Sequence, residues 1–139
     1  MSAPEAIRTL HGLYTEAMDA AAWSAVGELF ARGRLTGPDG ATVAEGAAGV
    51  QGLYSSMVRL HDGSPRTRHV TANAVIEVDG DTATSRSAFV VHQQLEGLPL
   101  QAICAGRYLD RFACTDGAWH FVERQFFLDQ VGDLSGHLA

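Results

Sequence analysis

The chain has 139 residues, 46% of them hydrophobic, and this length predicts one domain that can bury a core of its own. With 10 basic and 16 acidic residues the net charge is -6, which disfavours binding to nucleic acid or to an anionic membrane. Cys104 and Cys114 have no metal-ligand spacing, so we expect free thiols and neither a metal nor a cofactor. No stretch has the pattern of a targeting or membrane-spanning segment, and we expect a soluble, cytoplasmic protein.

The first half of the chain has helical periodicity. Ser2 and Glu5 form a capping-box pattern, and apolar side chains then recur at helical spacing up to Asp19. The sequence Pro38-Asp39-Gly40 is typical of a tight turn. We therefore predict helices over residues 2–19, 20–30 and 46–60, and a small hairpin over residues 34–43.

From residue 66 onward the pattern changes to strands. Short turn sequences containing Gly80, Gly97 and Gly117 separate long segments of alternating polarity. Helices followed by strands indicate an α+β domain over residues 1–130, in which helices cover one face of an antiparallel meander. Residues 131–139 are predicted to be a flexible tail. The expected strands cover residues 66–79, 82–94, 98–113 and 118–129.

One of these strands carries a histidine on a polar face. Between residues 68 and 78, Val70 and Ile76 belong to an apolar parity, whereas His69, Thr71 and Asn73 belong to a mostly polar one. The polar face must meet water, a partner or a ligand cavity. This pattern makes His69 the first candidate for a chemical role.

Several short motifs, in this order and spacing, are similar to one known family. They are Tyr14-xxxx-Asp19-xxx-Trp23, the helix start at Gly46, Arg68-His69-xxx-Asn73, Gly106-Arg107-Tyr108-x-Asp110, and Gly117-x-Trp119 followed by Arg124. Together they resemble the SnoaL-like branch of the nuclear transport factor 2-like superfamily. The resemblance implies a cone-shaped α+β barrel, with N-terminal helices packed in a curved antiparallel sheet around a pocket.

Within that superfamily, the pattern looks most like the scytalone dehydratase and bile-acid 7α-dehydratase type. The resemblance implies that Asp19 and His69 form a catalytic dyad, that Tyr14 donates a proton or polarises a carbonyl, and that water is eliminated without a cofactor. Polyketide cyclases and double-bond isomerases share the cone and are the alternatives among enzymes. All of these activities belong to secondary metabolism or related small-molecule chemistry.

The residues themselves fit this chemistry but leave other interpretations open. Removal of a proton next to a carbonyl needs a base that titrates near neutral pH, and histidine is such a base. A carboxylate beside it fixes the tautomer, although Asp19 could instead cap the next helix. Tyr14 could stabilise enolate charge, or it could be a core residue of the helical stripe.

Other polar and aromatic residues are candidates for binding a substrate. Arg124 lies in an apolar strand and needs a structural carboxylate or an anionic substrate group as its partner. His92 is a second acid or base or a solvated strand histidine, and Asn73 is a pocket amide or a bulge residue. Arg107, Tyr108 and Asp110 are assigned to sheet packing or a dimer surface. The predicted apolar lining consists of Trp23, Phe30, Met57, Phe89 and Phe126.

We therefore expect a hydrophobic small-molecule substrate of polyketide, steroid-like or aromatic type. The rival hypothesis is a non-catalytic subunit that binds a small ligand or takes part in an assembly. The family resemblance also implies a homodimer or higher homo-oligomer that pairs through the outer sheet face.

Overall fold

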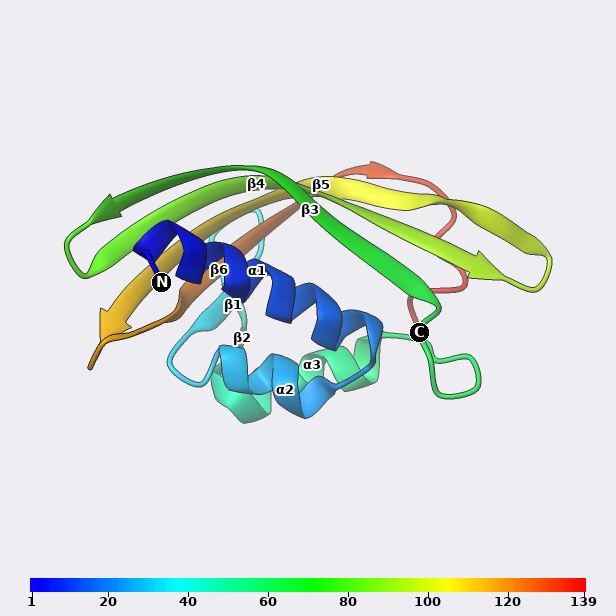
Figure 1. The fold of residues 1–139 in the computed structure, drawn as a ribbon. Helices are drawn as coiled ribbons and strands as arrows, with labels where there is room; N and C mark the ends of the chain where they lie inside the picture. The colour runs from blue at the N-terminus through cyan, green and yellow to red at the C-terminus, as the bar shows by residue number, and fades with distance from the viewer.

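The computed structural model describes residues 1–139 and has the predicted α+β fold, a curved sheet that wraps around helices (Figure 1). None of its helices combines the length and the apolar character needed to cross a membrane. The elements are, in order, α1 (Ala3–Asp19), α2 (Trp23–Leu29), β1 (Arg34–Thr36), β2 (Thr42–Glu45), α3 (Gly46–Met57), β3 (Thr67–Asp79), β4 (Thr82–Leu95), β5 (Leu98–Thr115) and β6 (Ala118–Val131).

The six strands form one open sheet in the order β2-β1-β6-β5-β4-β3. Strands β3 to β6 are the predicted antiparallel meander. The expectation of a wholly antiparallel sheet is wrong at one place, because β1 pairs with β6 in parallel. The β1–β2 hairpin thus extends the meander at its last strand, and the sheet is mixed. Figure 1 shows the helices beneath the concave face of the sheet.

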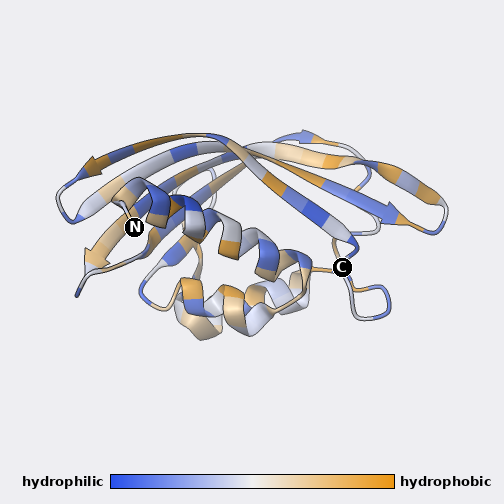
Figure 2. Ribbon diagram, viewed as in Figure 1, coloured by the Kyte–Doolittle hydropathy of each residue, from blue (hydrophilic) through white to orange (hydrophobic).

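Helix α1 begins as the sequence predicts. Ser2 and Glu5 form a capping box, in which each side chain bonds the backbone N–H of the other residue. The helix buries Ile7, Tyr14 and Met18 against the sheet, which is the predicted apolar stripe. Figure 2 shows this division into hydrophobic and hydrophilic parts along the helices and strands. The stripe fixes the rotation of α1 and places its C-terminal Asp19 near β3.

Helix α3 ends earlier than the sequence predicts. The apolar periodicity continues to Leu60, but the last helical residue is Met57. Val58 has an extended backbone, with φ -93° and ψ 128°, and pairs with Leu138. Pairing with the C-terminal segment therefore replaces the last helical turn.

Strand β3 changes its inward face at a bulge. Before the bulge, His69 and Thr71 are half-buried while Val70 is 44% exposed, so the polar parity faces the helices. The register with β4 then shifts, and Asn73 has a φ of +56°. His69 lies before the bulge, where the polar parity faces inward. Its ring is therefore directed into the molecule, although the apolar residues beside it face outward.

The segment after β6 differs from the flexible tail that we expected. Residues 133–139 fold back over the open end of the sheet, and His137 is only 7% exposed. Backbone hydrogen bonds join Arg59 N–H to the carbonyl of His137 and Ala139 N–H to the carbonyl of Met57, each at 2.8 Å. A polar tail sequence carries no periodicity, so this packing had no signal in the pattern.

Candidate functional site

The carboxylate of Asp19 is held by the first residues of β3. Its Oδ1 accepts hydrogen bonds from His69 Nδ1 at 2.6 Å and from Thr67 Oγ1 at 2.9 Å. Its Oδ2 accepts the backbone N–H of His69 at 2.9 Å. The end of α1 and the start of β3, which are 50 residues apart in the chain, thus meet at a carboxylate–imidazole pair.

The alternative role of Asp19 as a helix cap is not what the structure contains. Helix α2 begins at Trp23 with Ala22 at its N-cap position, and no side chain caps it. Asp19 instead ends α1, where the helix dipole disfavours a negative charge and no basic residue lies in the last turn. The three hydrogen-bond donors from β3 offset the unfavourable interaction of the Asp19 carboxylate with the helix dipole.

These donors also determine the protonation of the pair. Burial alone would raise the pKa of Asp19, but the hydrogen bonds from His69 and Thr67 outweigh burial and hold this pKa below its ordinary value. The carboxylate is therefore ionised at neutral pH and can only accept hydrogen bonds, so Nδ1 of His69 carries a hydrogen. In the neutral ring the free lone pair is then on Nε2, which has no hydrogen-bond partner in the protein.

The ring of His69 lines an apolar cavity of about 320 Å³ between α1, α3 and the inner face of the sheet. Eighteen residues form its wall, and 15 of them are hydrophobic. The predicted lining residues Met57, Phe89 and Phe126 are among them. The three others are the polar side chains of His69, Arg124 and His137. Few polar groups in an apolar cavity are typical of a site for a small molecule.

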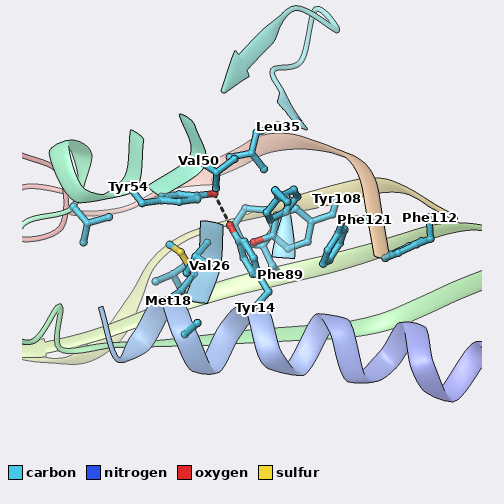
Figure 3. Packing of buried hydrophobic residues seen from close by; sticks show 14 of the residues in the cluster. Tyr14, Met18, Val26, Leu35, Val50, Tyr54, Phe89, Tyr108, Phe112 and Phe121 are labelled. Carbon is cyan, nitrogen blue, oxygen red and sulfur yellow. Dashed lines mark hydrogen bonds between the residues drawn. The ribbon is translucent and has the colours of Figure 1, made fainter. Parts of the chain in front are cut away.

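Tyr14 contributes a hydroxyl group to the same cavity. Its hydroxyl oxygen lies 2.5 Å from that of Tyr54 in α3, and the two rings are buried (Figure 3). Burial raises the pKa of Tyr14 and, more strongly, that of Tyr54, so both hydroxyls keep their hydrogens at neutral pH. One hydrogen is used in the bond between them, and the other remains available to a ligand.

Arg124 is fully buried and packs against the ring of Tyr14. Its Nε and Nη2 donate to the two carboxylate oxygens of Asp110 at 2.8 and 3.0 Å, and Nη2 also donates to His11 Nδ1 at 2.8 Å. Burial would lower the pKa of Arg124, but Asp110 raises it above its ordinary value. The guanidinium stacks 3.6 Å from the ring centre of Tyr108 and 4.4 Å from that of Tyr14.

The third guanidinium nitrogen of Arg124, Nη1, has no hydrogen-bond partner. The sequence left open whether this arginine binds a structural carboxylate or a substrate group. The structure supplies the carboxylate, Asp110, and also leaves Arg124 on the cavity wall. Buried donors without a partner are uncommon in folded proteins, which makes Nη1 a candidate for ligand binding.

Other predicted binding residues lie away from the cavity. Phe30 is fully buried and stacks on Phe121, while Trp23 stacks on the outer side of Tyr54, because α2 packs against α1 and α3 rather than on the cavity. Asn73 is the bulge residue of β3 and is exposed. His92 has the outward parity of β4, since Val91 and Gln93 on either side are buried.

An open polar cleft of about 970 Å³ lies on the other side of the Asp19–His69 pair. Arg66, Arg68 and His92 line it, together with Asp19 and His69. The pair therefore separates a polar cleft that is open to solvent from the apolar cavity. His92 belongs to the polar cleft and not to the cavity.

Sequence reasoning missed four residues of the site. Tyr108 and Asp110 were assigned to sheet packing or a dimer surface, but Tyr108 lines the cavity and Asp110 is the buried partner of Arg124. Their alternation with exposed Arg107 and Leu109 was a signal that both face inward. Tyr54 and His137 had no distinguishing pattern. No group of three histidine, cysteine or acidic side chains lies close enough together to hold a metal ion.

Comparison with known proteins gives the same fold. Residues 1–125 match the family model described as the SnoaL-like domain. No curated protein matches the sequence. A protein of unknown function from Mycobacterium tuberculosis is 26% identical, with a TM-score of 0.74 over 91% of this chain and 71% of that one.

Two further solved structures are similar. A nuclear transport factor 2-like protein with a cystatin-like fold from Novosphingobium aromaticivorans is 25% identical, with a TM-score of 0.74 over 90% of this chain and 80% of that one. A hexachlorocyclohexane dehydrochlorinase of the LinA type from Novosphingobium barchaimii is 20% identical, with a TM-score of 0.72 over 96% of this chain and 90% of that one.

Proposed function

The chain belongs to the family of SnoaL-like domains, and from this premise we propose that it is a cofactor-independent lyase that eliminates water from a hydrophobic, oxygen-bearing small molecule. One observation carries the proposal. The imidazole of His69 lines an apolar cavity, and its Nδ1 lies 2.6 Å from an ionised carboxylate, that of Asp19. This is the arrangement that a general base requires.

In the proposed reaction Nε2 of His69 removes a proton from the carbon next to a carbonyl group. The Asp19 carboxylate stabilises the imidazolium that forms, because it accepts the Nδ1 hydrogen and carries the opposite charge. The carbon–oxygen bond at the adjacent carbon then breaks. The imidazolium returns its proton to the departing oxygen, which leaves as water, and His69 is ready for another turnover.

The enolate that forms in the first step needs donors for its oxygen. We assign this role to Arg124 Nη1 and to the hydroxyl pair of Tyr14 and Tyr54, which lie together on the cavity wall. The pair of Arg124 with Asp110 fixes the guanidinium before a substrate arrives. Donors held in place inside an apolar cavity stabilise developing charge more than flexible donors in water do.

The cavity wall supports a hydrophobic class of substrate. Hydrophobic side chains form most of it, and about 320 Å³ accommodates a compact ring system. The polar groups allow for a carbonyl and one further oxygen. A polyketide-, steroid- or aromatic-like precursor has these properties.

Dehydration is preferred to cyclisation or double-bond isomerisation for one reason. The dehydrochlorinase that shares the fold carries out an elimination according to its name. A cyclase and an isomerase would use the same base and the same enolate-binding groups. A non-catalytic ligand-binding or assembly subunit would need the cavity but would not need His69 as a base.

The proposal can be tested without knowledge of the natural substrate. Benzylacetone, an apolar ketone that carries a phenyl ring, is incubated with the protein in heavy water, and exchange of its α-hydrogens is followed by NMR. We expect catalysed exchange by the wild type and a fall of about a hundredfold or more in His69→Gln and Asp19→Asn. Exchange that is absent from the wild type, or that persists in both folded variants, would support the non-catalytic subunit.

We also propose that two copies pair through the outer face of the sheet. Val70 and Leu109 are each more than a third exposed on β3 and β5. An exposed apolar surface of this kind is typical of an interface between proteins. Sedimentation equilibrium is expected to give a dimer, and Leu109→Asp to give a monomer; a wild type that remains monomeric at high concentration would reject the pairing.

A further inference from the structure

The C-terminal segment completes the wall of the cavity. Leu134, His137 and Leu138 line it, although the sequence gives this segment no periodic pattern. Leu138 pairs with Val58 after α3, and the last residue bonds to the carbonyl of Met57. Figure 1 shows the C-terminus beside the chain that leaves α3. Residues that follow the last strand therefore form part of the cavity wall.

The segment is also tied to the sheet, at Gly136. The carbonyl oxygen of Gly136 accepts a hydrogen bond from Gln93 Nε2 at 3.1 Å and lies 2.7 Å from His61 Nε2. Gln93 is fully buried, and its amide also bonds the carbonyl of Pro65. A Cβ atom at Gly136 would lie 2.5 Å from a methyl group of Leu95, so a side chain there would displace the end of the Leu95 side chain. These contacts fix the position of the next residue, His137.

His137 is one of three polar side chains on the apolar wall. Its ring centre lies 6.3 Å from that of His69, with the ring planes at 63°. It is 7% exposed, and its Nδ1 has no hydrogen-bond partner. Leaving a buried polar atom unpaired costs stability, and an apolar residue would fill the position without that cost. Nδ1 itself has almost no accessible surface, whereas Nε2 has no partner in the protein and is not fully buried, so Nε2 is the nitrogen that a ligand in the cavity can reach.

We propose that His137 hydrogen-bonds the leaving oxygen of the substrate, opposite the base His69. This inference rests on the proposed function of the same site. It adds a substrate-contacting residue from outside the sheet and helices. It also narrows the substrate class to a ketone whose second oxygen is on the carbon β to the carbonyl, within reach of both imidazoles.

The charge state of His137 fits a donor that keeps its proton. Burial, followed by the nearby His69, lowers the pKa of His137 to about 4. The ring is then neutral at pH 7 and has one N–H and one lone pair. A neutral imidazole can donate a hydrogen bond to the departing oxygen while His69 alone accepts and returns the proton.

The proposed step is balanced without another reactant. His69 takes the α-proton, and the electron pair of the C–H bond forms the enolate. The enolate then forms the carbon–carbon double bond as the carbon–oxygen bond breaks. The oxygen takes the proton from His69 and leaves as water, and His137 donates its hydrogen bond throughout and ends unchanged.

The test compares two compounds that differ in one hydroxyl group. Benzylacetone undergoes only α-hydrogen exchange, whereas its β-hydroxy derivative can lose water to give benzylideneacetone, which is followed by its ultraviolet absorbance. His137→Leu is expected to slow elimination by about a hundredfold and to slow exchange far less. His137→Asn, which retains a donor, is expected to recover part of the lost rate.

A matched control separates this role from a structural one. Leu138→Ala changes the next residue of the same segment, which also lines the cavity, and is expected to affect both reactions equally. An equal loss of exchange and elimination in His137→Leu would overturn the inference, because it would indicate loss of packing. Unchanged elimination in His137→Leu would overturn it as well.

A binding measurement makes the result independent of turnover. The dissociation constants of the two compounds are measured by NMR titration for the wild type and His137→Leu. We expect the variant to bind the hydroxy compound about tenfold more weakly and benzylacetone unchanged. If both ligands weaken together, or neither does, His137 does not contact the hydroxyl. Failure of the base hypothesis would instead be seen as wild-type exchange that does not depend on His69.

Discussion

Asp19 accepts hydrogen bonds from both the backbone N–H and the ring Nδ1 of His69, at 2.9 and 2.6 Å. The carboxylate therefore fixes the main chain of β3 and the orientation of the imidazole at the same time. Because both contacts come from one residue, a shift of the end of α1 relative to β3 would move the ring as well as its partner. This relationship makes the Asp19 carboxylate difficult to replace.

Asp19→Asn should reverse the tautomer of His69. The amide has one oxygen, and the backbone N–H of His69, which can only donate, holds this oxygen in the place of Oδ2, while the hydroxyl of Thr67 can turn and accept. The amide NH2 group then faces Nδ1 and favours hydrogen on Nε2, which removes the free lone pair from the cavity side. Ring nitrogen chemical shifts measured by NMR are expected to show hydrogen on Nδ1 in the wild type and on Nε2 in the variant.

Glu16→Gln is the matched control for this change. It removes one carboxylate from α1 beside the same polar cleft but does not touch His69. Its spectrum should have the wild-type pattern for His69. If Asp19→Asn and Glu16→Gln gave the same ring shifts, the carboxylate would not control the tautomer.

Much of the architecture could be predicted from the sequence because local signals agreed with the fold. The capping box of Ser2 and Glu5, the turn glycines and the change from helical to strand periodicity placed most elements. The apolar stripe that ends at Asp19 also indicated a carboxylate in an unfavourable position at a helix end. That position alone left a cap of the next helix open, and the pairing with His69 came from the family resemblance.

The rest depended on relationships that are not local. Counting back from the Thr115–Ala118 pair of the last hairpin places Asp110 opposite Glu123. A bulge between Arg111 and Phe112 shifts the register by one residue and places Arg124 there. Side-chain parity in a strand reverses with each such shift, so a periodic pattern alone cannot assign the inward face beyond a bulge.

Tyr14→Phe should weaken both the enolate-binding group and the fold. The change removes the partner of the Tyr54 hydroxyl, which is buried. We expect a loss of about 1 kcal/mol of unfolding free energy, the usual net value of one such hydrogen bond. Exchange of benzylacetone should slow by about tenfold to a hundredfold. Denaturant unfolding and NMR exchange measure the two effects.

The stability control for this variant is Tyr108→Phe. The ring of Tyr108 also stacks on Arg124, but its hydroxyl makes no hydrogen bond in the protein. Its unfolding free energy should remain near that of the wild type. A loss equal to that of Tyr14→Phe would mean that the contact between the Tyr14 and Tyr54 hydroxyls contributes nothing specific.

Asp110→Asn should be far more damaging to the fold. Asp110 and Arg124 are both buried, and the amide leaves the guanidinium charge without its counter-ion. Breaking a buried pair in this way costs about 3–5 kcal/mol. Denaturant unfolding measures the change. Asp129→Asn, which breaks the exposed ion pair with Arg107, is expected to leave the midpoint of denaturant unfolding unchanged. Equal effects of the two variants would contradict the role assigned to burial.

Two buried histidines should make the protein sensitive to mild acid. Burial and the charge of Arg124 lower the pKa of His11 to about 3, and burial and His69 lower that of His137 to about 4. Both rings have an ordinary pKa of 6.5 when the chain is unfolded. Below pH 6.5 the unfolded chain therefore binds protons that the folded protein does not bind, and acid favours unfolding.

The unfolding free energy should consequently be fully present above pH 6.5 and fall between pH 6.5 and 4, by about 1.4 kcal/mol per pH unit for each histidine. Asp19 has a lowered pKa, so its contribution is lost only at lower pH, near the ordinary range of a carboxylate. Denaturant unfolding at pH 7, 6 and 5 measures the slope in this window. His137→Asn should remove the contribution of His137 to this pH dependence of the unfolding free energy and leave the contribution of His11. A slope that is the same in the variant and the wild type would show that His137 is not held neutral by the fold, since only a group whose proton affinity changes on unfolding contributes to the slope.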